Sequence, residues 1–314
     1  MKKKIVIAGG TGFIGQQLAL WYTPEYEVVV LSREVNGQNN SYNCLNKMNG
    51  SIRIVHWNGA DIDKWSEELE DAEMLINLSG KSVNCRYTEK NKKAILDSRI
   101  RSTQVLGRAI SLLNKPPQLW INAASATIYR HAIDAAQDEQ SELLQNDFSV
   151  QVCKEWEKAF FAADTPVTRK VCLRMAIVLG NGGVMVPYTN LVKAGLGGKQ
   201  GSGKQMFSWI HMTDLCRLID FIRDHSRLEG ILNASAPMPV RNEVFMQTLR
   251  KICKVRIGFP MYRWMVHLGA RIIGTEPELM LKSRWVIPAR LCDAGFVFRY
   301  GNIDKALDDI IRKR

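Results

Sequence analysis

The chain opens with the segment Lys3-Lys4-Ile5-Val6-Ile7-Ala8-Gly9-Gly10-Thr11-Gly12-Phe13-Ile14-Gly15, which carries the strongest structural signal in its sequence. Residues 5–7 are apolar and β-branched, as in a buried strand. The glycines end this strand, and the next residues predict a helix with one apolar face made by Ile14, Leu18 and Trp21. A tight turn between strand and helix lets the backbone approach a pyrophosphate, whose charge meets the free N–H groups of the helix N-terminus. The segment therefore predicts a dinucleotide-binding loop.

The glycine spacing of this loop is Gly9-x-x-Gly12-x-x-Gly15. Such spacing alone also fits an ordinary glycine-rich turn, but here a strand precedes it and a helix follows. We expect the loop to hold the pyrophosphate, with the Thr11 hydroxyl bonded to phosphate. The residues of this segment expected at the cofactor are Gly9, Thr11, Gly12, Phe13, Ile14 and Gly15.

A second apolar run, residues 27–31, ends in Ser32 and Arg33. In a fold of this kind, the tip of the second strand lies beside the adenosine ribose, where an acid binds the free 2′-hydroxyl of NAD. This chain has a hydroxyl and a guanidinium there instead, and a guanidinium suits a 2′-phosphate. The alternative is an ordinary surface arginine after a strand. We predict NADP(H) as the cofactor, with Ser32 and Arg33 at its 2′-phosphate.

Composition is that of an ordinary globular protein. The 314 residues, 46% hydrophobic and 24% charged, predict one large domain with a smaller appendage. No stretch reaches the roughly 18 apolar residues of a membrane span, and Gly9 interrupts the first apolar run too early for a secretory signal. The cysteines form no Cys-x-x-Cys pair, which predicts no metal site and mostly small core side chains in a reducing cytoplasm. They are Cys44, Cys85, Cys153, Cys172, Cys216, Cys253 and Cys292.

The formal net charge of +12 raises the question of a nucleic-acid partner. Lysine and arginine are spread along the whole sequence, with short clusters at residues 2–4 and 312–314. No helix-turn-helix, zinc-finger or RNA-binding aromatic motif accompanies them. A basic surface also attracts anionic nucleotides or nucleotide sugars. We therefore expect a small-molecule substrate, with no nucleic acid and no membrane as partner.

Strand-like and helix-like segments alternate along the chain. The predicted strands after the second are residues 51–57, 73–79, 119–124 and 170–179, and the predicted helices between them are 88–113 and 147–163. This alternation predicts an α/β fold with a doubly wound parallel sheet and helices on both faces. We place that domain at residues 1–180, with 205–235 returning to it. Residues 181–204 and 236–314 predict a smaller substrate lobe, with the substrate cleft between the lobes.

The glycine loop and Ser125-Ala126-Thr127-Ile128-Tyr129 together resemble the extended short-chain dehydrogenase/reductases of the nucleotide-sugar epimerase type. Other segments narrow the resemblance to an atypical epimerase-like branch with a C-terminal DUF1731 region. They are Asn77-Leu78-Ser79-Gly80, 98–103, Trp156-Glu157, 195–198, Ser208-Trp209-Ile210-His211, 288–291 and Gly295-Phe296-Val297-Phe298. The resemblance implies a Rossmann sheet of order 3-2-1-4-5-6 plus a further strand, and a small C-terminal α/β substrate lobe. It also places Asn77, Leu78, Ser79 and Gly80 along an NADP-type cofactor.

The residue pair that usually moves the proton in these enzymes is missing. The pair is Tyr-x-x-x-Lys, in which the lysine charge lowers the pKa of the tyrosine one helical turn away. Alignment on Glu157 puts Ser149 at the tyrosine position and Cys153 at the lysine position. Lys154 is one position off, about 100° around the helix, so it does not substitute. No Tyr-x-x-x-Lys occurs elsewhere in the sequence.

Two candidates for the chemistry remain. Ser125 ends a predicted strand and matches the serine that hydrogen-bonds the reacting oxygen in the standard enzymes, although a strand-end serine also bonds backbone. Tyr129 is the nearest phenol and a candidate proton donor, with packing at the cleft wall as the alternative. The family usually has glycine and a second tyrosine here, whereas this chain has Ile128 before Tyr129 and Arg130-His131 after it.

Four further residues are candidate substrate contacts. His211 either touches substrate or belongs to a region that caps a helix and ties the lobes together, in which case Thr213 or Asp214 is the N-cap. The other three fall in family-like segments expected to face the cleft and would hold an anionic substrate, with a solvated surface position as the alternative. They are Arg86, Arg99 and Lys204.

These features favour a cytoplasmic NADP(H)-dependent oxidoreductase or epimerase-like enzyme whose substrate is an anionic or sugar-like small molecule. Hydride would pass to or from a carbonyl carbon near Ser125, polarised by that hydroxyl. The rival is a binding protein that senses NADPH without turning it over, which the loss of tyrosine and lysine favours. The sequence leaves open the substrate and the oligomeric state, a homodimer included.

Overall fold

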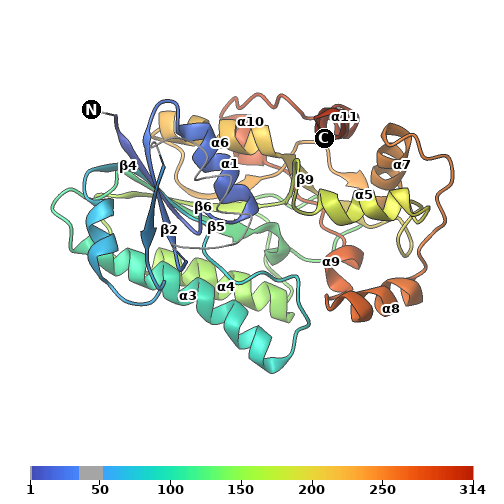
Figure 1. The fold of residues 1–314 in the computed structure, drawn as a ribbon, viewed down its shortest axis with the longest axis horizontal. Coiled ribbons are helices and arrows are strands. Elements are labelled where there is room, and N and C mark those ends of the chain that lie inside the picture. The colour runs from blue at the N-terminus through green and yellow to red at the C-terminus, as the bar shows by residue number, and fades with distance from the viewer. Residues whose placement is uncertain (1, 35–51, 314) are drawn as a thin grey trace.

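A computed structural model describes residues 2–34 and 52–313. Its central sheet has seven parallel strands in the order β10-β6-β5-β4-β1-β2-β3, which confirms the predicted doubly wound order with one further strand (Figure 1). The strands are β1 (Lys4–Ala8), β2 (Glu27–Ser32), β3 (Ile52–His56), β4 (Ala72–Asn77), β5 (Leu119–Ser125), β6 (Arg169–Met175) and β10 (Gly230–Ala234). Strands β1, β2 and β5 are buried along almost their whole length, because helices cover both faces of the sheet.

The two faces of the sheet bury alternate residues of the same strands. In β1, Ile5 and Ile7 belong to one hydrophobic core, whereas Val6 and Ala8 belong to the other, as the two-residue period of a strand requires. The first core is covered by α1 (Phe13–Tyr22) and α6 (Met212–Asp224), and the second by α3 (Glu89–Ser111) and α4 (Phe148–Phe161) (Figure 1). Helices α3 and α4 begin where predicted because the side chains of Thr88 and Asp147 cap them.

One predicted helix face is wrong at Trp21. Its side chain is 41% exposed, and its indole N–H donates to Asp220 Oδ2 at 2.7 Å. The neighbouring Tyr22 is buried in its place, together with Leu18 and Ala19. The α1 helix therefore turns Tyr22 toward the core, and the partner of Trp21 is a residue of α6 that local spacing does not reveal.

The predicted strand at residues 170–179 is two strands. β6 ends at Met175, and β7 (Ile177–Leu179) pairs in parallel with β9 (Trp209–His211) in a separate sheet. The amide of Ala176 still donates to Ala234 of β10, so the chain leaves the central sheet at this residue. After this break, the chain continues through β7 to α5 (Met185–Lys193), outside the central sheet.

A third core lies beside the sheet (Figure 1). It is built by α5 (Met185–Lys193), α7 (Asn242–Ile252) and α11 (Ile303–Arg312), together with the small sheet of β8 (Met206–Phe207) and β11 (Val240–Arg241). The other short elements are η1 (Lys64–Leu69), η2 (Ala126–Ile128), α8 (Arg263–Ile273), α9 (Glu278–Leu281) and α10 (Ala289–Asp293).

Several sequence expectations concern cysteines, metals and membranes. Cys153, Cys172 and Cys216 are buried as expected, Cys292 is exposed, and Cys44 lies outside the described residues. Among residues 2–34 and 52–313, no three His, Cys, Asp or Glu side chains are grouped to hold a metal ion. In the same part of the chain, no helix is both long enough and apolar enough to span a bilayer.

Candidate functional site

The glycine loop lies at the carboxyl edge of the sheet, directly after β1. Gly9 has a φ of +76°, and a Cβ there would lie 3.0 Å from the carbonyl carbon of Leu78. A Cβ on Gly15 would lie 2.5 Å from the Cα of Gly10. The fold itself therefore requires glycine at both positions. Gly12 differs, because a Cβ there comes no closer than 3.7 Å to any neighbour, the carbonyl oxygen of Gly9.

The N-terminus of α1 faces the space outside this loop. Its N-cap residue, Gly12, supplies no side-chain acceptor, and its first turn contains no acidic residue. The first N–H groups of the helix and the positive end of its dipole are thus available to an anion. Gln16 fixes the loop by donating its side-chain amide to the carbonyl of Thr11 at 2.7 Å. This arrangement suits a phosphate group.

A cavity of about 490 Å³ adjoins the loop between the tips of β1, β2 and β4. Ser32 is buried there and accepts the N–H of Glu34 at 3.3 Å. Arg33 is exposed, and no carboxylate of the described residues forms an ion pair with it. The Oγ of Ser79 is buried without a hydrogen-bond partner in the described part of the chain. The predicted cofactor residues that line this cavity are Gly9, Thr11, Gly12, Ser32, Arg33, Leu78, Ser79 and Gly80.

Part of this cavity was missed by the sequence reading. The residues after β3 line it, as do side chains at the start of the loop after β4 and on α3. The position of these loops in the sequence could have predicted part of this lining. A loop that follows a parallel strand lies at the same edge of the sheet as the glycine loop. The missed residues are Leu31, Glu34, Trp57, Asn58, Gly59, Ala60, Lys81, Asp97, Ser98, Arg101 and Ser102.

Asn77, predicted at the cofactor, has a structural role in the sheet. It is fully buried and lines neither cavity of the cleft. Its side-chain amide donates to Asn122 Oδ1 at 2.7 Å, and its Oδ1 accepts the N–H of Ser79 at 3.0 Å. The residue therefore joins β4 to β5 and fixes the backbone that presents Ser79.

A second cavity, of about 410 Å³, shares Gly9, Gly12 and Leu78 with the first, so the two form one cleft. Phe13 and Ile14 line it, together with Arg99, Ser125 and Trp156. The Phe13 ring is surrounded by a second glycine cluster, in which a Cβ on any member would lie about 3 Å or less from the ring. That cluster is Gly180, Gly182 and Gly183.

Ser125 is placed in this second cavity as predicted. Its Oγ accepts the N–H of Thr127 at 3.2 Å, which caps the short helix η2. The capping bond uses an oxygen lone pair and leaves the hydroxyl hydrogen for another acceptor. Both readings of this serine, a cap and a donor toward the cleft, are compatible with this geometry.

Tyr129 does not face the cleft, which corrects the second candidate for the chemistry. Its side chain is fully buried, and its hydroxyl donates to Asn233 Oδ1 and accepts from Arg174, both at 2.9 Å. Arg174 is itself held by the carboxylate of Glu157 through bonds of 2.8 and 2.7 Å. Burial raises the pKa of Tyr129 to about 12. The phenol thus belongs to a buried polar network that joins the end of η2 to α4, β6 and β10.

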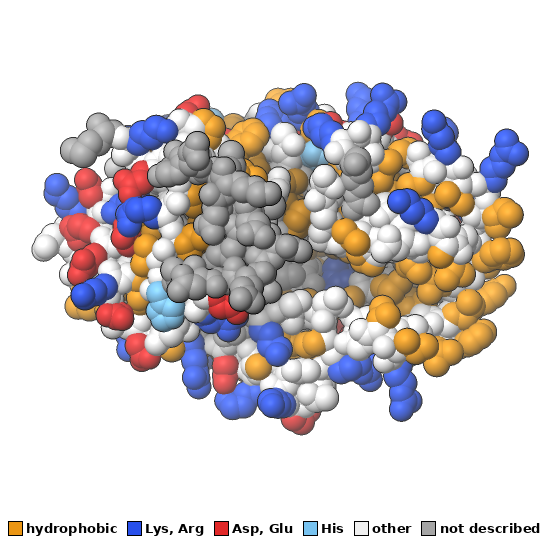
Figure 2. Space-filling view, viewed as in Figure 1, with side chains coloured by type: hydrophobic (Ala, Val, Ile, Leu, Met, Phe, Trp, Pro, Cys, Tyr) orange, Lys and Arg blue, Asp and Glu red, His pale blue; other side chains and the backbone are white. Residues whose placement is uncertain are grey.

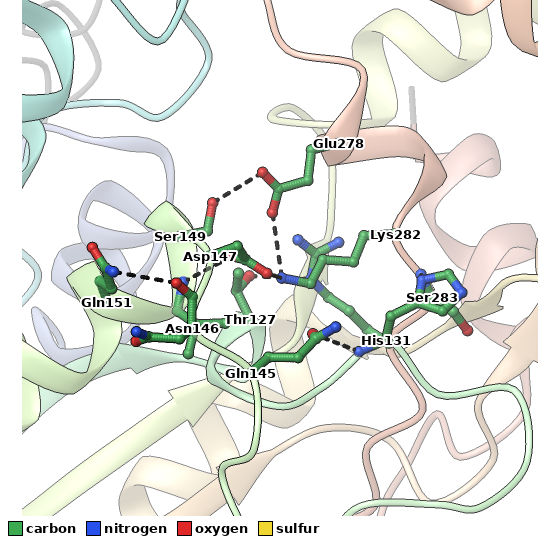
Figure 3. A network of polar contacts seen from close by, with 12 residues as sticks. Thr127, His131, Gln145, Asn146, Asp147, Ser149, Gln151, Glu278, Lys282 and Ser283 are labelled. Atoms are coloured by element: carbon green, nitrogen blue, oxygen red, sulfur yellow. Dashed lines mark hydrogen bonds and ion pairs between the residues drawn. The ribbon is translucent and has the colours of Figure 1, made fainter. Parts of the chain in front are cut away.

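The two positions that the resemblance assigns to the usual catalytic pair hold Ser149, which Figure 3 shows, and Cys153. Ser149 donates to Glu278 Oε2 at 3.2 Å, and the same carboxylate lies 3.4 Å from the ammonium of Lys282. Cys153 is buried, and burial raises the pKa of its thiol to about 12. Lys154 points away and donates to the carbonyls of Leu143 and Gln145.

A phenol that the sequence reading missed lies next to Ser149. The Tyr87 ring packs edge-on against Phe148 with centroids 5.1 Å apart, and its hydroxyl hydrogen-bonds with Ser149. Burial raises the pKa of Tyr87, while the bond to Ser149 lowers it. The turn before α3 thus places a tyrosine beside Ser149, although Tyr87, like Tyr129, lines neither of the two cavities.

Two arginines, the half-buried Arg99 at the second cavity and the buried Arg284, form no ion pair with a carboxylate of the described residues. Arg99 lies over the Trp156 ring at 5.1 Å and donates to the carbonyls of Lys81 and Ile95. Arg284 is 8% exposed and donates its Nε–H to Thr127 Oγ1 at 3.1 Å. Burial lowers the pKa of both guanidinium groups. An anionic ligand is the natural partner of such cations, because an unpaired buried charge is costly.

His211 has the capping role that the sequence reading offered as one alternative. It is 3% exposed, its Nδ1 accepts the N–H of Thr213 at 3.1 Å, and its Nε2 lies 3.4 Å from Asp309. Burial lowers its pKa to about 4. The N-cap of α6 is therefore His211 itself, which corrects Thr213 and Asp214. Asp214 instead accepts the N–H groups of Arg299 and Tyr300 and so ties the C-terminal segment to α6.

The two remaining substrate candidates, Arg86 and Lys204, line neither of the two cavities of the cleft. Arg86 donates to the carbonyl of Thr275 at 3.1 Å and borders a third cavity, of about 720 Å³, with His131, Lys282 and residues of α8. Lys204 is exposed on the turn before β8 and lines none of these three cavities. The structure thus brings Arg99 to Ser125 but leaves Lys204 in solvent.

The sequence and fold both match known proteins. Residues 5–234 match the NAD dependent epimerase/dehydratase family, and residues 263–310 match DUF1731, a domain of unknown function. An epimerase family protein of Staphylococcus epidermidis is 30% identical over 313 residues, which cover 99% of each chain. The crystal structure of a human epimerase family protein (isoform 2) with NADPH has a TM-score of 0.85 and 28% identity, over 99% of this chain and 100% of that one. A nucleoside-diphosphate sugar epimerase of Corynebacterium glutamicum has a TM-score of 0.75 and 25% identity, over 99% of this chain and 58% of that one.

Proposed function

This chain belongs to the NAD dependent epimerase/dehydratase family, and on that premise we propose that it binds NADP(H) and acts as an oxidoreductase or epimerase-like protein on an anionic small molecule. The observation that carries the proposal is the continuous cleft in which the glycine loop, Ser125 and Arg99 meet. The similarity of the chain to a human protein crystallised with NADPH supports the choice of cofactor. We assign the cofactor to residues 1–180 and 205–235, and the substrate lobe to 181–204 and 236–314.

The residues of the first cavity fit a dinucleotide phosphate. Ser79 offers a buried hydroxyl that lacks a partner in the described residues, and Gly12 leaves open space at the uncapped end of α1. We assign the pyrophosphate to Gly9, Thr11 and Gly12, and the 2′-phosphate to Ser32 and Arg33. NADP(H), when bound, supplies a hydride donor or acceptor. The chain supplies the orientation of the substrate and the movement of the proton.

The chemistry at the substrate falls to residues of the second cavity and their neighbours. The Thr127 N–H donates to a lone pair of the Ser125 oxygen and leaves the hydroxyl hydrogen unused. Ser125 donates that hydrogen to a carbonyl oxygen of the substrate. Arg99 and Arg284 hold the negative charge of the substrate, which offsets the cost of burying two unpaired guanidinium groups. Tyr87, hydrogen-bonded with Ser149, replaces the fully buried Tyr129 as our candidate for the proton donor.

The first experiment tests the cofactor. We expect NADPH to raise the melting temperature more than NADH does, and Arg33→Ala to remove that difference by weakening NADPH binding about tenfold or more. The matched control is Arg227→Ala, which removes an exposed arginine between α6 and β10, at the opposite edge of the sheet. An equal shift by NADPH and NADH in the native protein would contradict the cofactor assignment.

The second experiment separates an enzyme from an NADPH sensor. With a panel of anionic carbonyl compounds, we expect NADPH oxidation that Ser125→Ala slows about 100-fold while NADPH binding is unchanged. Tyr87→Phe should lower the rate and alter its pH profile, whereas Tyr129→Phe should leave the pH profile unchanged. Binding of NADPH with no turnover across the panel would favour the sensor, in keeping with the neutral side chains at positions 149 and 153.

A further inference from the structure

A large apolar surface lies on the outer side of α8 and of the extended segment before it. We call it the α8 face, and its side chains are 53–76% exposed. Its residues are Ile257, Phe259, Tyr262, Trp264, Leu268, Ile272 and Ile273. Figure 2 shows hydrophobic side chains gathered at the right end of the molecule, the end where Figure 1 places α8. Apolar patches of this kind usually mark an interaction site.

Helix α8 already buries a different apolar face. Val266 and Ala270 are 1% and 2% exposed, so the packing of the helix on the protein uses that side. The spacing of Trp264, Leu268 and Ile272 makes a second apolar stripe that points outward. An ordinary surface helix carries polar residues on its outer side. The internal packing of the protein therefore does not account for this stripe.

The segment before α8 is held in place by backbone hydrogen bonds. The Phe259 N–H donates to the carbonyl of Gly195 at 2.8 Å, and the Met261 N–H donates to that of Lys199 at 2.9 Å. The N–H of Gly198 donates back to the carbonyl of Phe259 at 3.1 Å. Phe259 and its neighbours are thus presented outward on a fixed ribbon rather than on a free loop.

The chain around the α8 face carries charge of one sign. No acidic residue occurs between Glu243 and Glu276, and that interval contains six basic ones: Arg250, Lys251, Lys254, Arg256, Arg263 and Arg271. Residues 195–201, which pair with the segment before α8, contribute Lys199 and no acid. Taken together, residues 181–204 and 236–275 contain ten lysines and arginines and one glutamate. Most of the net charge of +12 therefore lies in these two segments.

We propose that the α8 face docks onto the surface of an anionic lipid bilayer. Aromatic and aliphatic side chains such as Trp264 and Ile272 enter the headgroup boundary, and the surrounding lysines and arginines meet the lipid phosphates. A second copy of the chain would bring the same positive charge against itself. A nucleic acid would neutralise the charge but leave the apolar stripe in water. The proposal concerns surface docking only and replaces the expectation that no membrane is a partner.

Flotation of the whole protein with lipid vesicles tests this proposal. We expect the protein to float with phosphatidylcholine vesicles that contain phosphatidylglycerol, and not with phosphatidylcholine alone, with binding weakened by added salt. The double variant Trp264→Gln/Ile272→Gln should lower binding about tenfold or more. Leu112→Gln/Val167→Gln is the matched control, because both leucine and valine are 74% exposed and lie elsewhere.

A charge variant separates the electrostatic part of the docking. Lys254→Gln/Arg256→Gln should weaken binding to the anionic vesicles about tenfold, whereas Lys90→Gln/Lys305→Gln, which removes two exposed charges elsewhere, should not. All four residues are exposed, and melting curves verify that each variant folds. The proposal is overturned if the protein stays unbound at low salt, or if Trp264→Gln/Ile272→Gln floats as the native chain does. Self-association that this double variant abolishes, without vesicle binding, would identify a second copy as the occupant.

Discussion

The two ends of the cleft are built by different means. At the phosphate end, the features that matter belong to the backbone: Gly9 and Gly15 fit where no side chain does, and α1 presents its uncapped N–H groups. At the other end, the features that matter are side chains, and the positions that the resemblance assigns to the usual tyrosine and lysine hold Ser149 and Cys153. The fold needs the first set for its own packing but does not need the second. Catalytic side chains can therefore change while the cofactor end keeps its form.

Side chains with reactive groups at the second end mostly serve the structure. Tyr129 is enclosed by Arg174 and Asn233, and His211 caps α6. Both lie in segments that resemble functional parts of the family, and both are buried. A reactive residue type in a family-like segment is thus weak support for a catalytic role until its exposure is known. The four predictions below test this contrast between the two ends.

The largest expected effect is at Arg174. Arg174→Met should lower the free energy of unfolding by about 3–5 kcal/mol, because it leaves the Glu157 carboxylate buried and unpaired. Urea denaturation measures the loss, and Arg174→Met/Glu157→Leu should recover part of it. At a temperature where the single variant is folded, NADPH should still stabilise it. A loss below about 1 kcal/mol would show that this network is not a structural anchor.

The second effect is a pH dependence that comes from His211. Its pKa is about 4 in the folded protein and about 6.5 when unfolded, so the unfolded state binds the proton first as pH falls. The free energy of unfolding therefore keeps its full value above pH 6.5 and falls as pH drops toward 4, by about 3 kcal/mol in total from this histidine. His211→Asn keeps a capping acceptor without titrating, so its unfolding free energy should fall less over the same range. Equal pH slopes in the two proteins would contradict the buried, neutral histidine.

The third prediction compares two glycines of the loop. Gly15→Ala should cost about 1–3 kcal/mol of stability, since its Cβ would lie 2.5 Å from the Cα of Gly10. Gly12→Ala should cost about 1 kcal/mol or less, as its Cβ has open space, but should abolish most of the thermal shift with NADPH. Melting curves with and without NADPH measure both. If Gly12→Ala kept the full NADPH shift, the space outside Gly12 would not be the pyrophosphate site.

The last effect, no larger than that of Gly15→Ala, is expected at Tyr129. Tyr129→Phe removes a buried hydroxyl that bonds Asn233 and Arg174, and should lower stability by about 1–3 kcal/mol. NADPH binding should be unchanged, because the ring lies outside the cleft. Chemical denaturation and cofactor titration check the two parts. A loss of NADPH-dependent turnover larger than the loss of folded protein would return Tyr129 to the list of catalytic candidates.

The cofactor end was largely predictable from the sequence. The strand, glycine turn and helix are local features, and Ser32 and Arg33 follow from their place at the tip of the second strand. The role of the Asn77 side chain was not predicted, since strand position alone does not show that its amide is used to join β4 to β5. Arg284 was missed because nearly 160 residues separate it from its partner Thr127, and only packing brings them together.

The sequence by itself determined the alternation of strands and helices, the glycine loop and the lack of any Tyr-x-x-x-Lys, because each depends on residues close together in the chain or on residue identity. The order of the strands was expected only from the resemblance to a known family. Only the tertiary structure decided which way side chains face and what they meet. It buried Tyr129 and His211, brought Tyr87 to Ser149, and left the outer stripe of α8 in solvent. Burial and long-range contacts are set by the packing of distant segments, and that packing enclosed the catalytic candidate Tyr129 and the substrate candidate His211.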